Sequence, residues 1–125
     1  NETHLEINRI LEKNGVFFFT VPFLWSLHES PNDHYRFTPY ALEKLLKNNG
    51  FYDINIKVMG GWHASMAQFL GLWIKRSPMR NWKRKLLMPF IILIVRFLVL
   101  FDKGDTTVIE DGLMIPSIYG WALKK

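Results

Sequence analysis

The sequence predicts a mixed α/β fold in which helices and strands alternate, and three observations support this prediction. Two helical patterns and two strand patterns alternate in the first sixty residues. Residue types that favour the start or the end of a helix occur where these patterns change, namely Gly15, Thr38-Pro39 and Gly50. Of the 125 residues, 49% are hydrophobic, enough to bury a core. Alternation of this kind is typical of a parallel sheet with helical crossovers.

The first helix and the first strand are expected within residues 2–23. Apolar residues from Ile7 to Leu11 have helical spacing, and Gly15 suits the left-handed position that follows a helix. The run VFFFTVPF, residues 16–23, is apolar nearly throughout and is bounded by glycine and proline. Such a run predicts a central strand that is buried on both faces of the sheet.

The second helix and the second strand are expected within residues 38–59. Thr38 can cap the helix with Pro39 at its first position, and Gly50 suits its end. The segment FYDINIKVM then alternates apolar and polar residues, the period of a strand with one wetter face. Three leucines share one face of the helix: Leu42, Leu45 and Leu46.

Residues 60–112 break this alternation and predict a basic and apolar helical insertion. The run LLMPFIILIVRFLVLF, residues 86–101, would reach about 24 Å as a helix, short of the ~30 Å hydrocarbon core of a bilayer. A spanning helix is therefore not expected. Three roles stay open: a helix that completes the core, a face for self-association, and a helix in a membrane interface. An earlier apolar stripe has helical spacing: Met66, Phe69, Leu70, Trp73 and Ile74.

These patterns divide the chain into three parts. Residues 1–59 hold the helix, strand, helix, strand unit, residues 60–112 hold the insertion, and residues 113–125 hold a final strand in SIYGWALKK. Two strands with two helices leave sheet edges uncovered, so further strands are expected from elsewhere. The chain opens at Asn1, as if inside a helix, which indicates a piece of a longer protein.

The net charge of +5 is unevenly distributed, because no acid lies between Asp53 and Asp102. The basic patch in that interval suits phosphate, anionic lipid or an acidic partner, or is a solvated face that aids solubility. A nucleic-acid partner is not expected, because Trp73 and Trp82 beside the basic run fit burial as well as base stacking. The patch comprises Lys57, Lys75, Arg76, Arg80, Lys83, Arg84, Lys85 and Arg96.

Several classes of site are not expected. The chain has no cysteine, which excludes disulfides and thiolate metal sites, and its four histidines form no paired helical motif. Gly60 and Gly61 are the only close glycines, so a glycine-rich phosphate loop is absent, as is a Gly-x-Ser-x-Gly nucleophile motif. No secretory signal pattern is present, so we expect a cytoplasmic location, with contact at the inner face of the membrane as the alternative.

The segment HESPNDHYRFTPYAL, residues 28–42, carries the candidate site. It leaves the carboxyl end of the first strand, where ligands bind in open α/β sheets. His28 can accept a proton near neutral pH, Glu29 and Asp33 can orient a histidine or a substrate hydroxyl, and Arg36 can bind a carboxylate or phosphate. Structural roles stay open for these same residues, since Asp33 and Arg36 can pair with one another.

These segments resemble a known family. Lys13 to Gly15, with Asn14 where a first glycine would stand, then Pro22-Phe23, the loop from His28 to Thr38, and Gly50-Phe51 resemble class I S-adenosylmethionine-dependent methyltransferases of the type 11 group. The match covers residues 2–58 and the carboxyl-terminal half of such enzymes. It is especially similar to those found with bacterial glycan and cell-surface polysaccharide enzymes.

The resemblance implies the carboxyl-terminal part of a Rossmann-like, doubly wound, seven-stranded methyltransferase sheet. The chain would hold strands five, six and seven, with IPSIYGWALKK as the antiparallel seventh strand and a helical insertion before it. S-adenosylmethionine, the cofactor of the complete enzyme, would be held by a missing amino-terminal half. This chain alone would then be inactive.

The resemblance also implies roles within the loop. His28 would be the general base for an acceptor hydroxyl, in O-methylation of a glycan or small molecule. A homo-oligomer and peripheral membrane contact are further partners to consider. The alternative function is a non-catalytic interaction or membrane-interface module built on the insertion. The residues expected to bind substrate are Glu29, Asp33, His34, Tyr35 and Arg36.

Overall fold

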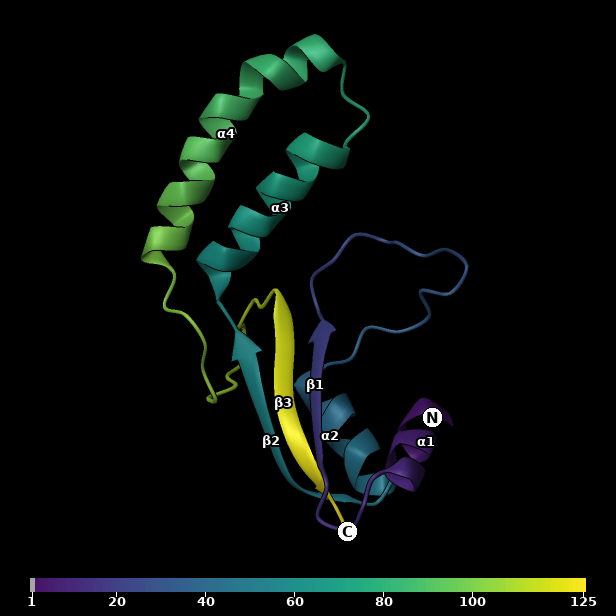
Figure 1. The fold of residues 1–125 in the computed structure, drawn as a ribbon. Coiled ribbons are helices and arrows are strands. Elements are labelled where there is room, and N and C mark those ends of the chain that lie inside the picture. Colours follow the sequence, from purple (N-terminus) through teal and green to yellow (C-terminus); the bar gives the residue numbers. More distant parts are fainter. Residues whose placement is uncertain (1) are drawn as a thin grey trace.

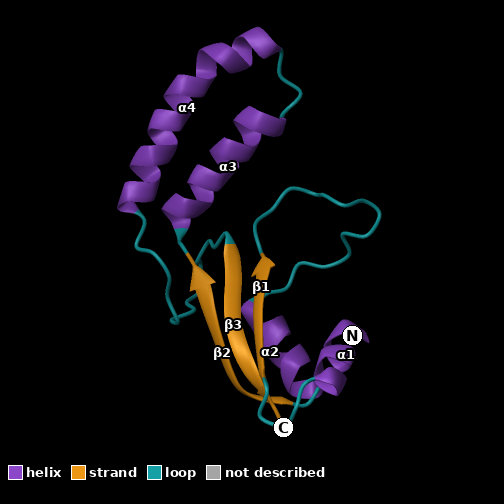
Figure 2. Cartoon of the chain, in the orientation of Figure 1, coloured by secondary structure: helices purple, strands orange, loops and turns teal. Residues whose placement is uncertain are grey.

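The computed structural model describes residues 2–125 as a small α/β unit that carries a long helical hairpin. A three-stranded sheet has two helices on one face, and the hairpin extends beyond one end of the sheet (Figures 1 and 2). The elements in chain order are α1 (Glu2–Ile10), β1 (Val16–Pro22), α2 (Pro39–Asn48), β2 (Phe51–Met59), α3 (Trp62–Arg76), α4 (Asn81–Phe101) and β3 (Ser117–Lys124).

The sheet has the order β1-β3-β2, and β3 is antiparallel to both of its neighbours. The strands β1 and β2 therefore run in the same direction but do not pair, and the sheet of the described residues is antiparallel, not the parallel sheet that the alternation predicted. The antiparallel insertion of the last strand, which the resemblance implied, is confirmed. Gly120 lies at the centre of this arrangement, opposite Phe19 on one side and Ile56 on the other.

β1 is an edge strand of the described sheet, not the central strand that its apolar sequence predicted. Of its seven residues only Phe19 is buried, while Val16 and Phe18 are 59% and 62% exposed. The reason is that both neighbouring helices cover the same face. Ile7 of α1 packs against the core cluster to which Leu42 of α2 belongs. Among the described residues, no helix covers the opposite face of β1. One edge of β1 pairs with β3, and its other edge pairs with no strand of this part of the chain.

The left-handed turn after α1 is formed by Asn14, not by Gly15. Asn14 has φ +63°, and its side-chain oxygen accepts a hydrogen bond of 2.9 Å from the hydroxyl of Tyr52. Gly15 is instead required by close packing, because a Cβ there would lie 2.8 Å from the carbonyl oxygen of Glu12. Asparagine tolerates this conformation better than most side chains, which explains why the helix ends without a left-handed glycine.

The core lies between the sheet and α2, as the leucine spacing predicted. Thr38 caps α2 by accepting a 3.1 Å hydrogen bond from the N–H of Ala41, and Gly50 follows the helix with φ +82°. This cap fixes the start of α2. The leucine face of the helix then packs against the strands. The buried cluster comprises Phe19, Leu42, Leu46, Phe51, Val58, Ile115, Ile118 and Ala122.

The insertion folds as two helices, α3 and α4, that pack against each other. The side chain of Asp102, the residue after α4, accepts hydrogen bonds from Gly61 N (3.1 Å) and Ala64 N (2.8 Å). Asp102 therefore caps the start of α3. No residue of α4 is buried, so this helix does not complete the core, and that expected role is wrong. Within residues 2–125, none of the helices is both long and apolar enough to cross a membrane.

Candidate functional site

The loop between β1 and α2, residues 23–38, leaves the carboxyl end of β1 and forms a wide excursion beside α3 (Figure 1). Its start is held by two backbone hydrogen bonds, from Phe23 N and Leu24 N to the carbonyl of Pro116, each 3.0 Å. The side-chain amide of Gln68 in α3 donates to the carbonyl of Leu24. The loop is therefore fixed at its base to both the sheet and the hairpin.

Asp33 is the centre of the polar contacts in this loop. Its side chain is only 6% exposed, and it accepts hydrogen bonds from Nη1 and Nη2 of Arg36, the latter 2.6 Å long. It also accepts the backbone N–H of His28 at 3.1 Å. The Arg36 guanidinium, and after it the His28 N–H, hold the pKa of Asp33 well below its usual range. Asp33 is thus a fixed negative charge at neutral pH.

His28 is the only histidine of the described chain that lies on a carboxylate. Its Nδ1 is 3.0 Å from Oδ2 of Asp33, and its ring lies 6.3 Å from that of Trp25. We assign the proton to Nδ1, since only this tautomer donates to the carboxylate. The lone pair is then on Nε2. A carboxylate on one ring nitrogen orients the imidazole and leaves the other nitrogen as an acceptor, which is the arrangement of a general base.

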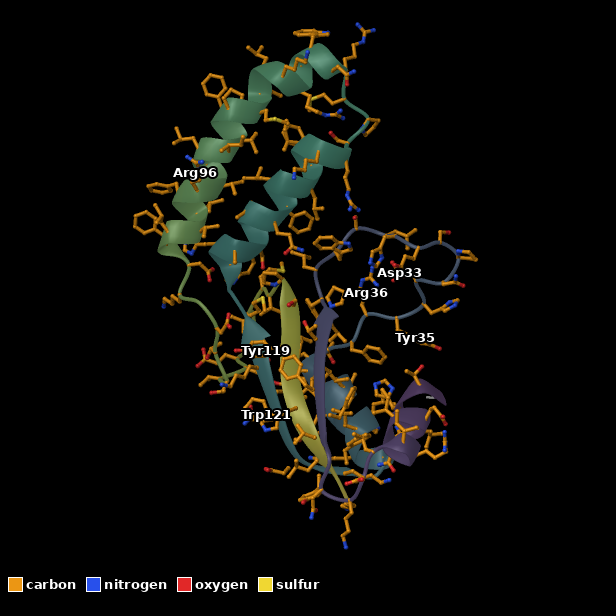
Figure 3. All side chains as sticks on the ribbon, viewed as in Figure 1. Asp33, Tyr35, Arg36, Arg96, Tyr119 and Trp121 are labelled. Carbon is orange, nitrogen blue, oxygen red and sulfur yellow. The ribbon has the colours of Figure 1, made fainter. Side chains whose placement is uncertain are left out.

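Four of the five expected substrate-binding residues line one hollow, and the fifth lies outside it. Asp33, His34, Tyr35 and Arg36 line an open hollow of about 300 Å³, and Figure 3 shows the first and the last of these side by side. Tyr35 is exposed and stacks on Phe37. Arg36 has both terminal nitrogens on Asp33, so it is not free to bind an anion through that fork. Glu29 is exposed and lies outside the hollow.

A second cavity, which the sequence did not predict, lies between the loop and α3. It has a volume of about 280 Å³, and its walls are almost entirely apolar. The guanidinium of Arg76 closes one side, donating to Oγ of Ser26 at 3.1 Å and lying 5.7 Å from the ring of Trp25. Trp73 and Arg76, three residues apart on α3, are its only local signal, because the two walls are some fifty residues apart in the sequence.

The strand-to-helix turn before α3 is already occupied by a side chain. Gly60 and Gly61 form this turn, which could bind an anion at the start of α3, but the carboxylate of Asp102 already accepts the N–H groups of Gly61 and Ala64 there. In residues 2–125 no three His, Asp or Glu side chains converge as metal ligands.

Comparison with known proteins adds no relative to this picture. The chain matches no protein-family model, no curated protein and no solved structure.

Proposed function

We propose that the chain is the carboxyl-terminal portion of an S-adenosylmethionine-dependent methyltransferase and supplies the loop on the acceptor side of its site. The observation that carries this proposal is the sheet order, in which the last strand enters antiparallel between two strands of common direction. The resemblance implies a last strand that inserts antiparallel into the sheet. The free edge of β1 and its exposed apolar face support it further, because further strands could pair at the edge and helices could cover the face.

The loop chemistry supports O-methylation of a hydroxyl on a glycan or small molecule. In this proposal Nε2 of His28 accepts the proton of the acceptor hydroxyl, which makes the oxygen a better nucleophile. Asp33 orients the imidazole through the 3.0 Å contact with Nδ1. Arg36 keeps Asp33 ionised and in place, so we propose it as a positioning residue. None of the described residues holds the methyl donor.

The alternative function, a non-catalytic interaction or membrane-interface module, is supported by the exposed apolar side chains of the hairpin. The two functions differ in one binding reaction. Isothermal titration of S-adenosylmethionine into the longest protein encoded by the reading frame that contains this sequence should give binding if the enzyme proposal holds. The 125-residue chain alone should give no heat. Absence of binding by the longer protein would refute the enzyme proposal.

The role of His28 is tested by methyl transfer from radiolabelled cofactor to a panel of glycans and small hydroxyl compounds. We expect His28→Ala to lower kcat by about 10²–10⁴-fold, the range typical of a lost general base. His63→Ala is the matched control, because His63 is exposed on α3, away from the hollow, and its loss should change little. Activity of the His28 variant within a few fold of the parent would exclude the base role.

A further inference from the structure

Helix α4 has two apolar faces, of which the structure covers only one. The face toward α3 is half-buried and consists of Leu87, Met88, Ile91, Val95 and Leu98. The opposite face has the same helical spacing, and no element of residues 2–125 packs over it. Figure 1 shows that α4 is the arm of the hairpin farther from the loop after β1. Its six side chains are 59–81% exposed: Trp82, Leu86, Phe90, Leu93, Phe97 and Leu100.

This outer face of α4 is far too apolar for a surface that meets only water. A helix of a globular protein normally directs polar residues away from its apolar stripe. Here the only charged residue within the run 86–101 is Arg96, which lies at the edge of the outer face (Figure 3). A contiguous exposed apolar surface of this kind marks a site where a protein or a membrane binds.

Positive charge gathers at the end of the hairpin where α3 meets α4. Six basic side chains lie there, and none of them forms an ion pair within the described chain. Trp82 is beside them, with the ammonium of Lys83 5.6 Å from its ring. Residues 54–101 contain no acid that could balance these charges. The six are Lys75, Arg76, Arg80, Lys83, Arg84 and Lys85.

We propose that the outer face of α4 docks into the interface of an anionic lipid bilayer, with the helix parallel to the membrane plane. Apolar side chains enter the boundary of the acyl chains, and the basic end contacts anionic headgroups. Tryptophan is favoured at this depth, which suits Trp82. The long side chain of Arg96 reaches the headgroups from the edge of the face. The proposal does not depend on methyltransferase activity.

Charge favours a lipid surface over the other occupants. Because the apolar run of residues 86–101 is too short to span the hydrocarbon core, the docking that we propose is in the interface. A second copy of the chain could cover the apolar face with an identical face. In a parallel pairing, however, its basic end would lie against the basic end of the first copy, where like charges repel. A layer of anionic headgroups balances all of those charges at once.

The test is flotation of the 125-residue chain with vesicles. Vesicles of phosphatidylglycerol and phosphatidylcholine in equal parts should carry the chain, and pure phosphatidylcholine should carry much less. Leu93→Glu with Phe97→Glu should weaken binding at least about tenfold, because two acids replace apolar contacts on the outer face. Ile10→Glu with Tyr40→Glu is the matched control, since these side chains are equally exposed on α1 and α2.

The contribution of charge is tested in the same assay. Lys83→Glu with Lys85→Glu should weaken binding at least about tenfold, whereas Lys13→Glu with Lys44→Glu carries the same change of net charge elsewhere and should weaken it far less. The proposal would be overturned if Leu93→Glu with Phe97→Glu bound vesicles as well as Ile10→Glu with Tyr40→Glu. It would also be overturned if the parent chain did not bind anionic vesicles. A dimer in lipid-free solution that Leu93→Glu with Phe97→Glu disperses, without vesicle binding, would assign the face to a second copy instead.

Discussion

Replacing Gly120 with alanine should disrupt the sheet at its centre. An ideal Cβ at this position would lie 2.0 Å from the backbone oxygen of Asn55 and 2.9 Å from the ring of Phe19. The first distance is roughly 1.4 Å short of ordinary contact, and the obstacle is backbone that cannot rotate away. Asn55 lies at the irregularity in the pairing of β2 with β3, so moving it would break that ladder.

The expected cost is at least about 3 kcal/mol, above the usual overpacking range of about 1–3 kcal/mol because a strand has to move. Single domains have a total stability of only about 5–15 kcal/mol, so this loss is large. Urea unfolding followed by circular dichroism measures it. Gly71→Ala is the control: Gly71 lies inside α3 with open space around it, so alanine should stabilise by about 0.5–1 kcal/mol. Unfolding of Gly120→Ala within about 0.5 kcal/mol of the parent would refute the steric argument.

Two other substitutions test the cap of α3 by Asp102 and the half-buried side chain of His4. Asp102→Ala removes the acceptor of Gly61 N and Ala64 N, and should cost about 1–2 kcal/mol and speed amide exchange at Ala64, while Asp111→Ala, an exposed control, should not. Unchanged exchange would show that the cap is not needed. His4 is half-buried, and burial lowers its pKa, so its contribution to stability is complete above its unfolded pKa of about 6.5 and is lost as pH falls. His4→Phe should therefore reduce the loss of stability between neutral pH and about pH 5, as measured by urea unfolding, and a pH dependence equal to that of the parent would exclude His4 as its source.

The sequence predicted the local elements of the first sixty residues well, because their signals are local. The cap by Thr38, the buried leucines of α2 and the strand Phe51–Met59 depend on residues near one another in the chain. Hydrophobic spacing also predicted helices in the insertion. What it could not supply was the surroundings of each element.

The wrong predictions about β1 and α4 share one cause: an apolar sequence does not indicate which element packs against it. Phe18 is as apolar as Phe19, yet only Phe19 faces the helices. The same holds for the outer face of α4, which sequence alone cannot distinguish from a core helix. In the loop, the types of residue indicated a site, but only the structure places Asp33 between His28 and Arg36.

The position of β3 in the sheet has a consequence for synthesis of the chain in the cell. Both other strands pair only with β3 among the described residues, and β1 meets it across about a hundred residues of sequence, from Val16 to Leu123. β1 and β2 therefore cannot be joined in one sheet until residues 117–124 have left the ribosome. Contacts between such distant segments form slowly, and exposed strand edges are prone to aggregate. A chain that stops before β3 would lack the strand that joins β1 to β2.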